Sequence, residues 1–348
     1  MPPDPEAGFA RDGVLPDRAE RELAALLATE DPKPRAPKGM PRRSVLLAGG
    51  AVTAVTAVAA SGEMGRLLGT SGGAAAAATT QPVLVLRRIA GRSSHDVLTE
   101  LAEKVGKLAP ETVQGPYLYT KTWGWWLNSA GDVPGGVANA AVPTVTEQWI
   151  RVSDGSGRER RQYGKPYFPN PDQERDAREA RLIEGKGVAD KTYEAGRFSP
   201  YPEWQRLIPF STDPDRLLTQ MKEVNWEAGR LIYGVSAMLN AAQLTSGGVV
   251  APELRAAALR VLAKRTDVTV TTTTTWQGQQ ALAVTQEGRY KNATFRDSLL
   301  IDPADGCPMG HEDALLGDPL ALNIAVPGTL SVSETLARGT VKDTESGI

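Results

Sequence analysis

Hydrophobic and polar positions alternate along several stretches of the chain, as they do in strands with one buried face. Residues 116–127 (PYLYTKTWGWWL) and 144–153 (TVTEQWIRVS) show this pattern most clearly, and the apolar run 83–90 is a third candidate strand. The turn sequence DGSG within residues 154–163 predicts a β-hairpin. The charged and proline-rich residues 164–200 are expected to form a loop with one exposed helix.

Elsewhere an apolar residue recurs at every third or fourth position, which is typical of amphipathic helices. These helices are expected at residues 94–108, 214–223, 226–243 and 252–265. Ser93 or Ser94 would cap the first helix, and a proline begins the helices at 214 and 252. These segments therefore predict a helical block in the second half of the chain.

The chain then returns to alternation and to β-branched residues. Further strands are expected at residues 268–276, 279–287, 294–302, 307–316 and 329–339. Strands that precede and follow a helical block favour an α+β fold, with one antiparallel sheet covered by helices on one face.

Near the N-terminus, residues 44–62 form an uncharged run rich in Ala, Gly and Thr. At ~1.5 Å per residue, this run as a helix would cross a hydrocarbon core of ~30 Å. Basic residues precede the run and Glu63 follows it, which places residues 1–41 in the cytoplasm and the rest outside. This pattern predicts a single-pass transmembrane helix over residues 42–62, followed by a spacer at 63–81 and an extracytoplasmic domain at 82–348.

A second interpretation of the same run stays open. Arg42 and Arg43, followed by a modestly apolar stretch, also match a twin-arginine export signal. Cleavage after the small residues near Ala59 would then release a secreted protein, and Met40 is an alternative start. Both interpretations put residues 82–348 outside the cytoplasm.

Composition narrows the function classes. The net charge is −2 and charged residues make up 23% of the chain, which argues against a nucleic-acid partner. One cysteine, Cys307, excludes an internal disulfide, and only two histidines are present. No nucleophile elbow, zinc-protease motif or phosphate-binding loop occurs in the sequence. We therefore expect a protein without enzymatic activity, catalytic residues, cofactor or metal.

The segment around His311, Glu312 and Asp313 is the most polar stretch of a predicted strand. Alternation places His311 and Asp313 on one side and Glu312 on the other. We interpret the segment as a solvated strand face. No basic residue flanks Cys307 in the sequence, so we expect it to be a small, half-buried residue and not a nucleophile.

The aromatic residues of the strand at 116–127 are the best candidates for a binding site. Tyr117, Tyr119, Trp123 and Trp125 share one face of this strand, whereas Trp126 points the other way. They are expected between the sheet and the helices. There they either fill the core or line a groove for an apolar ligand.

The order of a short basic stub, an Ala-rich span, a β-rich body and helices leading into LLIDPADGCPMGHEDALL (299–316) resembles an actinobacterial family of membrane-anchored proteins of unassigned function. Its members are often associated with extracytoplasmic-function sigma factors. The strand–DPADG–strand hairpin is similar to the repeated hairpins of the half-barrel fold in periplasmic lipoprotein carriers such as LolA and in the sensor RseB. The resemblance carries no catalytic residues, and the stub is too short for a helical domain that sequesters a sigma factor.

The resemblance implies an antiparallel half-barrel ectodomain that binds or senses a lipid, a lipoprotein or an envelope protein, with a role in envelope or sigma-factor signalling. Two alternatives stay open. One is a secreted hydrolase exported by the twin-arginine route, and the other is a structural envelope protein without a ligand.

Overall fold

The computed structural model describes residues 83–348, apart from 134–135, 184, 199–206, 224–230, 291, 320–321 and 323. The described residues belong to one compact unit of the chain. The predictions for the stub, the transmembrane or signal helix and the spacer lie outside them. Among the described residues, none of the helices combines the length and apolar character that a membrane crossing requires.

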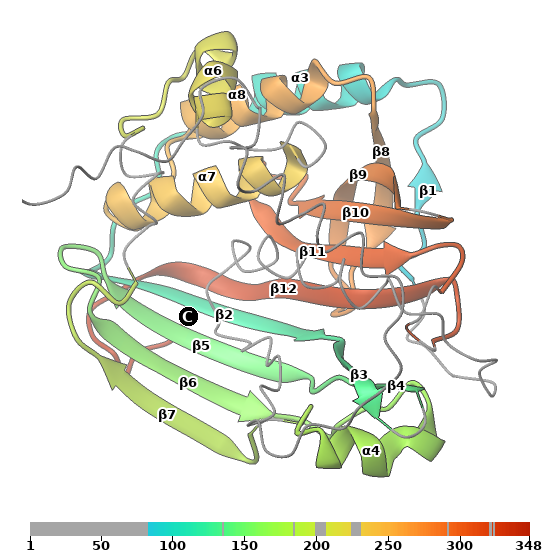
Figure 1. The fold of residues 1–348 in the computed structure, drawn as a ribbon. Helices are drawn as coiled ribbons and strands as arrows, with labels where there is room; N and C mark the ends of the chain where they lie inside the picture. Colours follow the sequence, from blue (N-terminus) through green and yellow to red (C-terminus); the bar gives the residue numbers. More distant parts are fainter. Residues whose placement is uncertain are drawn as a thin grey trace, which may run out of the picture. The chain divides into compact units, whose positions relative to one another are not determined.

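A ten-stranded antiparallel sheet organises the described residues (Figure 1). Its order is β1-β8-β9-β10-β11-β12-β2-β5-β6-β7, and it is open between β1 and β7. The strands are β1 (Arg87–Arg88), β2 (Tyr117–Trp126), β5 (Thr144–Arg151), β6 (Gly157–Tyr163), β7 (Val188–Tyr193), β8 (Val268–Thr274), β9 (Gln280–Tyr290), β10 (Ala293–Ile301), β11 (Pro308–Leu315) and β12 (Gly328–Val341). With the helices below, this arrangement confirms the predicted α+β class.

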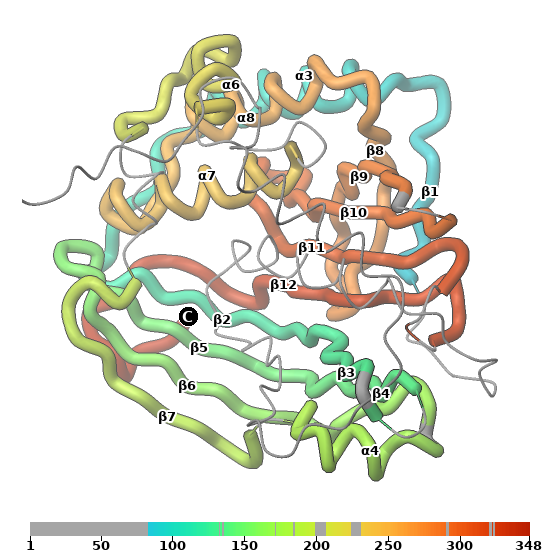
Figure 2. Tube along the Cα trace, viewed as in Figure 1, coloured from blue at the N-terminus to red at the C-terminus, as the bar shows by residue number. Residues whose placement is uncertain are grey.

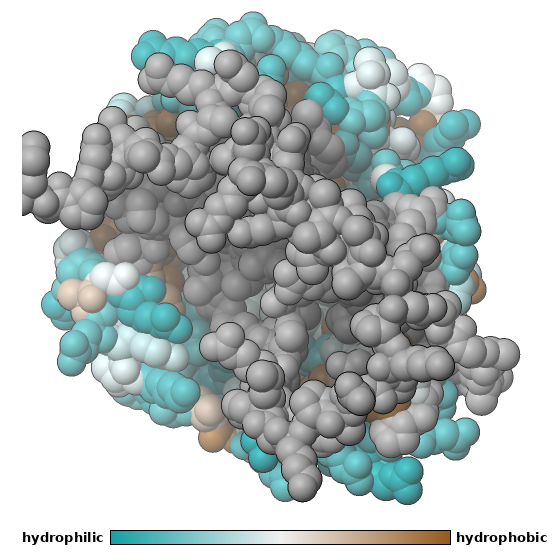
Figure 3. Space-filling model, in the orientation of Figure 1, coloured by the Kyte–Doolittle hydropathy of each residue, from teal (hydrophilic) through white to brown (hydrophobic). Residues whose placement is uncertain are grey.

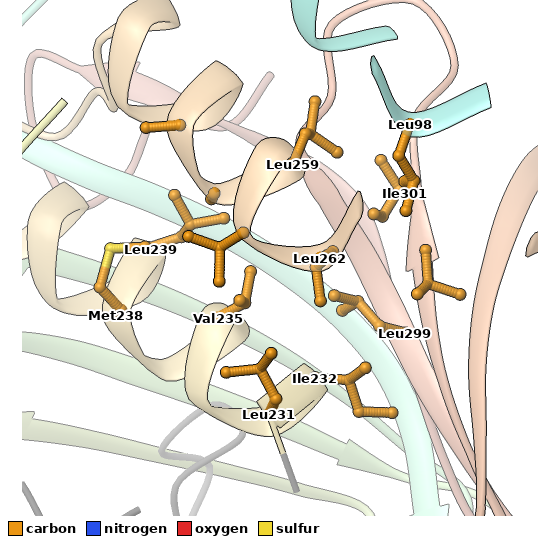
Figure 4. Packing of buried hydrophobic residues seen from close by; sticks show 14 of the residues in the cluster. Leu98, Leu231, Ile232, Val235, Met238, Leu239, Leu259, Leu262, Leu299 and Ile301 are labelled. Atoms are coloured by element: carbon orange, nitrogen blue, oxygen red, sulfur yellow. The ribbon is translucent and has the colours of Figure 1, made fainter. Parts of the chain in front are cut away.

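The helices expected to begin at residues 94, 214 and 252 do begin there, and the start expected at residue 226 lies outside the described residues. Ser93 caps α3 (Ser94–Val105) through a capping box with Asp96, which satisfies backbone N–H groups of the first turn. The other long helices are α6 (Pro214–Glu223), α7 (Leu231–Thr245) and α8 (Pro252–Ala263). In Figure 4, apolar residues of α7 and α8 point toward Leu299 and Ile301 of β10. These helices and strands share the largest hydrophobic core.

Cross-strand pairing shows which side of the sheet faces this core. Leu299, a core residue, lies opposite His311, which lies opposite Ser333, which in turn lies opposite Gly124. Side chains of directly paired residues share one face, so these four positions mark the helix-bearing face. Residues that alternate with them lie on the opposite face.

The sheet bends toward the opposite face. Glu334 of β12 is three strands away from β9, yet its carboxylate accepts hydrogen bonds from the backbone N–H groups of Trp276 (2.5 Å) and Gln277 (3.0 Å) in the β8–β9 turn. Figure 2 shows β8 and β9 running steeply across the direction of β10–β12. Burial of Glu334 raises the pKa of its carboxyl. The hairpin therefore folds over the face that lies away from the helices.

Several elements differ from the prediction. A hairpin of β3 (Asn128–Val133) and β4 (Gly136–Ala140) was not expected. Residues 164–200 contain the short helices η1 (Pro171–Gln173) and α4 (Glu174–Glu179) as well as the edge strand β7. The predicted strand 83–90 is reduced to the two residues of β1, because the N–H of Leu84 bonds to the Glu312 side chain instead of to a neighbouring strand.

Candidate functional site

Polar side chains from a helix and two strands meet on the helix-bearing face. The Tyr233 hydroxyl of α7 donates to Oδ1 of Asp313 on β11. Ser331 on β12 donates to the other carboxylate oxygen of Asp313 at 2.5 Å. The ring of His311 lies edge-on to Tyr233, with centroids 6.2 Å apart. We call Tyr233, His311, Asp313 and Ser331 the polar cluster.

Local structure accounts for the position of each member. His311 and Asp313 are two residues apart on β11 and therefore project from the same face. Ser331 is the direct cross-strand partner of Asp313, and Tyr233 lies in the first turn of α7. Asp297 of β10 is opposite Asp313 on the other side, so two carboxylates share this part of the sheet. The cluster thus sits at the place where α7 meets the centre of the sheet.

His311 has a shifted pKa in this environment. Burial lowers the pKa of its imidazole to about 4, because the charged form loses its hydration. The ring is therefore neutral at pH 7, and among the described residues its buried Nε2 has no hydrogen-bond partner. The interpretation of 311–313 as a solvated strand face is wrong on this side of β11, since Tyr233 packs against His311 and Asp313 and leaves both only partly exposed.

Glu312 contradicts that interpretation from the other side of β11. Its side chain is fully buried and forms an ion pair with Arg296 of β10 at 2.8 Å. It also accepts hydrogen bonds from the Leu84 N–H (2.7 Å) and the Thr329 hydroxyl (3.1 Å). A buried carboxylate needs several donors of this kind to offset its lost hydration. Glu312 therefore fastens the segment before β1 to the centre of the sheet.

A second polar group occupies the helix-bearing face of β5 and β6. Gln148 donates to Glu159 at 2.8 Å, and Arg161 pairs with the same carboxylate at 2.8 Å. Gln148 is opposite Thr120 of β2, which places this group on the same face as the polar cluster. Polar groups therefore occur at two places on the helix-bearing face, at the start of α7 and on β5 and β6, beside the apolar core that α3, α7 and α8 cover. In Figure 3, the described residues around the rim of the molecule are mostly hydrophilic.

Cys307 lies in a buried charged environment that the sequence did not indicate. Arg255 of α8 places Nη1 2.7 Å from the Cys307 sulfur, so a basic residue contacts the thiol although none flanks it in the sequence. The same nitrogen lies 2.7 Å from Glu111 and 3.7 Å from Asp305. Burial nevertheless raises the pKa of the thiol to about 11, so it is protonated at pH 7.

Glu111, Asp305 and Cys307 offer ligand atoms within 4.8 Å of one another, which is close enough for a metal ion. The guanidinium of Arg255 contacts all three side chains and supplies the positive charge that balances the carboxylates. A second guanidinium, from Arg338, bonds to Asp305 at 2.7 Å. The two arginines and two carboxylates therefore form an ion-pair network, which favours a structural role over a metal site for these residues.

The four predicted aromatic residues share a face, as expected, but it is the face away from the helices. Trp125 is paired with Val332 and Trp123 with Glu334, positions that alternate with the helix-bearing ones. Their expected location between sheet and helices is therefore wrong. They also separate into two clusters: Trp123 and Trp125 pack near Leu330 and Val332, whereas Tyr117 and Tyr119 pack near Trp149 and Val341.

Both clusters are filled with protein side chains. Trp125 is 3% exposed and Tyr119 is 2% exposed. The Tyr119 hydroxyl donates to Glu147 at 2.9 Å, and burial raises its pKa. Trp126 points to the other face and is 39% exposed. Tyr119 and Trp125 thus contribute to packing, and the four residues do not form one continuous groove.

Serine, histidine and aspartate occur together at two places, and neither forms a catalytic triad. In the polar cluster, Ser331 bonds to Asp313 and not to His311. At the start of α3, the Ser94 hydroxyl accepts from the Val270 N–H, and His95 Nδ1 lies 3.0 Å from the Ala263 carbonyl. Activation of a serine requires a serine–histidine hydrogen bond. These residues have structural contacts instead.

Tyr233, Arg255 and Arg296 were not predicted from the sequence pattern. Arg255 stands within an otherwise Ala- and Leu-rich helix face, which was an available signal of a buried charge. The contact of Tyr233 with Asp313 joins residues far apart in the chain and has no local signature.

No protein-family model matches the sequence, and no curated protein is significantly similar to it.

Proposed function

We propose that the chain is a membrane-anchored extracytoplasmic binding or sensor protein without enzymatic activity, and that its ligand contacts the polar cluster. The observation that supports this proposal is that the hydroxyl groups of Tyr233 and Ser331 both donate to the Asp313 carboxylate on the helix-bearing face. Hydroxyl and carboxylate groups held by a helix and two strands provide directional hydrogen bonds, which give a binding site its specificity. The anchor rests on the uncharged run 44–62 and its basic flank.

The bent antiparallel sheet with helices on one face supports a half-barrel fold of the LolA and RseB type as part of this proposal. One feature departs from a lipid-carrier groove, because the sheet bends away from the helices and its aromatic residues are packed. Among lipids, lipoproteins and envelope proteins, this favours a partner that offers polar groups over a free acyl chain. A role in envelope or sigma-factor signalling follows from the resemblance alone.

The alternative of a secreted hydrolase needs a nucleophile with a base in contact. Among the described residues, the Ser331–Asp313 bond leaves His311 without a serine partner, which does not favour this alternative. A structural envelope protein would need no polar cluster at the junction of α7 and the sheet.

The test is native mass spectrometry of the full chain purified in mild detergent from its own cells. We expect a bound molecule that is retained by the wild type and lost or strongly depleted in Ser331→Ala. Ser298→Ala is the matched control, since Ser298 is buried in the same sheet and pairs with Glu312 on the other face. Equal retention by all three proteins, or no bound molecule in the wild type, would contradict the proposal.

A further inference from the structure

The segment Lys342–Ile348, which follows β12, lies against β5 and β6 on the face away from the helices. The Trp149 indole N–H donates to the Ser346 carbonyl at 2.6 Å. Arg158 donates to the Thr344 carbonyl at 3.0 Å and pairs with the Glu345 carboxylate at 2.5 Å. Two side chains of the sheet therefore bind backbone and side chain of this segment as they would bind a peptide.

The surface beneath the segment is organised by contacts that do not involve it. Both ends of the Arg158 guanidinium bond to Asp190 of β7, at 2.9 and 2.7 Å. The guanidinium stacks over the Trp149 ring at 5.4 Å, and Trp149 packs on Tyr119 with centroids 5.3 Å apart. The donors are thus fixed in place before the segment binds, which lowers the entropic cost of recognition.

Gly339 of β12 provides space for the apolar end of the segment. A Cβ atom at this position would come within 2.4 Å of the Ile348 side chain. The surface therefore has three recognition elements: a guanidinium for a carboxylate, an indole N–H for a backbone carbonyl, and a gap for an aliphatic side chain.

The segment itself is held lightly. The Glu345 side chain is 79% exposed and Ile348 is 69% exposed. Asp343 accepts hydrogen bonds from the backbone N–H groups of Glu345 and Ser346, so part of the segment's hydrogen bonding is internal. Exposed ion pairs contribute little to stability. Another peptide with the same chemistry can therefore compete for the surface.

We propose that Tyr119, Trp149, Arg158 and Gly339 form a peptide-binding surface that segment 342–348 occupies in the same chain. Its second ligand is an acidic peptide segment of a partner protein, with a carboxylate and an aliphatic residue spaced as Glu345 and Ile348 are. Release of segment 342–348 frees the surface. This inference concerns the face opposite to the polar cluster and does not rest on the proposed function.

The test measures fluorescence polarisation of a labelled peptide with the sequence of residues 343–348 (DTESGI). The full chain, purified in detergent, is compared with a chain that stops after Val341. We expect saturable binding to the shortened chain and weak or no binding to the full chain. In the shortened chain, Arg158→Ala should weaken binding by about tenfold or more, because the hydrogen bond to the Thr344 carbonyl and the pair with Glu345 are lost together. Arg160→Ala, which changes the next arginine of β6, should leave binding within about twofold of the parent.

A second variant covers the case in which the shortened chain does not fold. Glu345→Arg in the full chain places two guanidinium groups together and should release the segment, so that added peptide binds. Failure of both the shortened chain and Glu345→Arg to bind the peptide would overturn the proposal. Equal binding with and without Arg158 would overturn it as well.

Discussion

Arg296 of β10 and Glu312 of β11 form a buried ion pair of 2.8 Å on the face of the sheet away from the helices. Glu312 also accepts hydrogen bonds from the Leu84 N–H and the Thr329 hydroxyl, so it has more hydrogen-bond partners than Arg296 has. Removal of Glu312 takes the ionic partner from the buried Arg296 guanidinium and one acceptor from each of two further donors. Removal of Arg296 leaves the carboxylate with two of its donors.

We therefore expect Glu312→Ala to lower the free energy of unfolding by about 3–5 kcal/mol, the range for breaking a buried pair. Arg296→Ala should cost less than Glu312→Ala. The measurement is urea unfolding of both variants. Glu174→Ala removes an exposed pair with Arg178 and should change stability by no more than about 0.5 kcal/mol. A larger loss of unfolding free energy for Arg296→Ala than for Glu312→Ala would contradict this comparison of their hydrogen-bond partners.

The pKa of His311, lowered to about 4 by burial, predicts a pH dependence of stability. The native imidazole binds its proton at lower pH than the unfolded chain, whose histidine has a pKa near 6.5. The neutral His311 side chain therefore makes its full contribution to the free energy of unfolding above pH ~6.5. This contribution is lost as the pH falls toward 4.

Between these limits the wild type should lose about 3 kcal/mol relative to His311→Gln. His95→Gln, at the other histidine, is measured alongside to separate the effects of the two residues. The measurement is urea unfolding at a series of pH values. Parallel curves for the wild type and His311→Gln would contradict a buried neutral imidazole.

Trp125 and Trp126 are neighbours in the chain, but Trp125 is packed in the core and Trp126 is exposed. Trp125→Ala should cost about 3–5 kcal/mol of unfolding free energy, since it empties a filled site. Trp126→Ala, at a 39% exposed position, should cost about 1 kcal/mol or less. If Trp125→Ala costs as little as Trp126→Ala, the aromatic residues line an open groove after all.

These residues also show what the sequence pattern can and cannot specify. Alternation placed Tyr117, Tyr119, Trp123 and Trp125 on one face, because side chains in a strand alternate with a period of two. It did not say which face the helices cover, since both faces of this sheet are largely buried. The start of α3 was predictable from local capping chemistry at Ser93.

Long-range contacts account for the other features of the structure that the sequence pattern did not predict. The N–H of Leu84 bonds to Glu312, a residue 228 positions away, and this contact replaces strand pairing at the start of the predicted first strand. Strand β7 has the sequence VADKTY, whose charged residues suit an edge exposed to water and hide its strand character. Tyr233 and Asp313 meet only because α7 folds back on β11, so the polar cluster had no local signal.

The predicted anchor has its own test. Lys33, Arg35, Lys38, Arg42 and Arg43 precede the uncharged run 44–62, and the full chain should therefore stay in the membrane fraction after a carbonate wash. Its N-terminus should be intact. Recovery of a soluble chain that begins near Ala60 would show that the segment is a cleaved export signal.

Hydrogen exchange measured by mass spectrometry tests the central claim, ligand binding at the polar cluster, most directly. The full chain purified with its bound molecule is compared with the same chain after the molecule has been stripped. We expect slower exchange in the bound form at the start of α7 and in β11 and β12 around Asp313 and Ser331, where binding would suppress local opening. Identical exchange in this region, or protection confined to β6 and β7, would contradict the account.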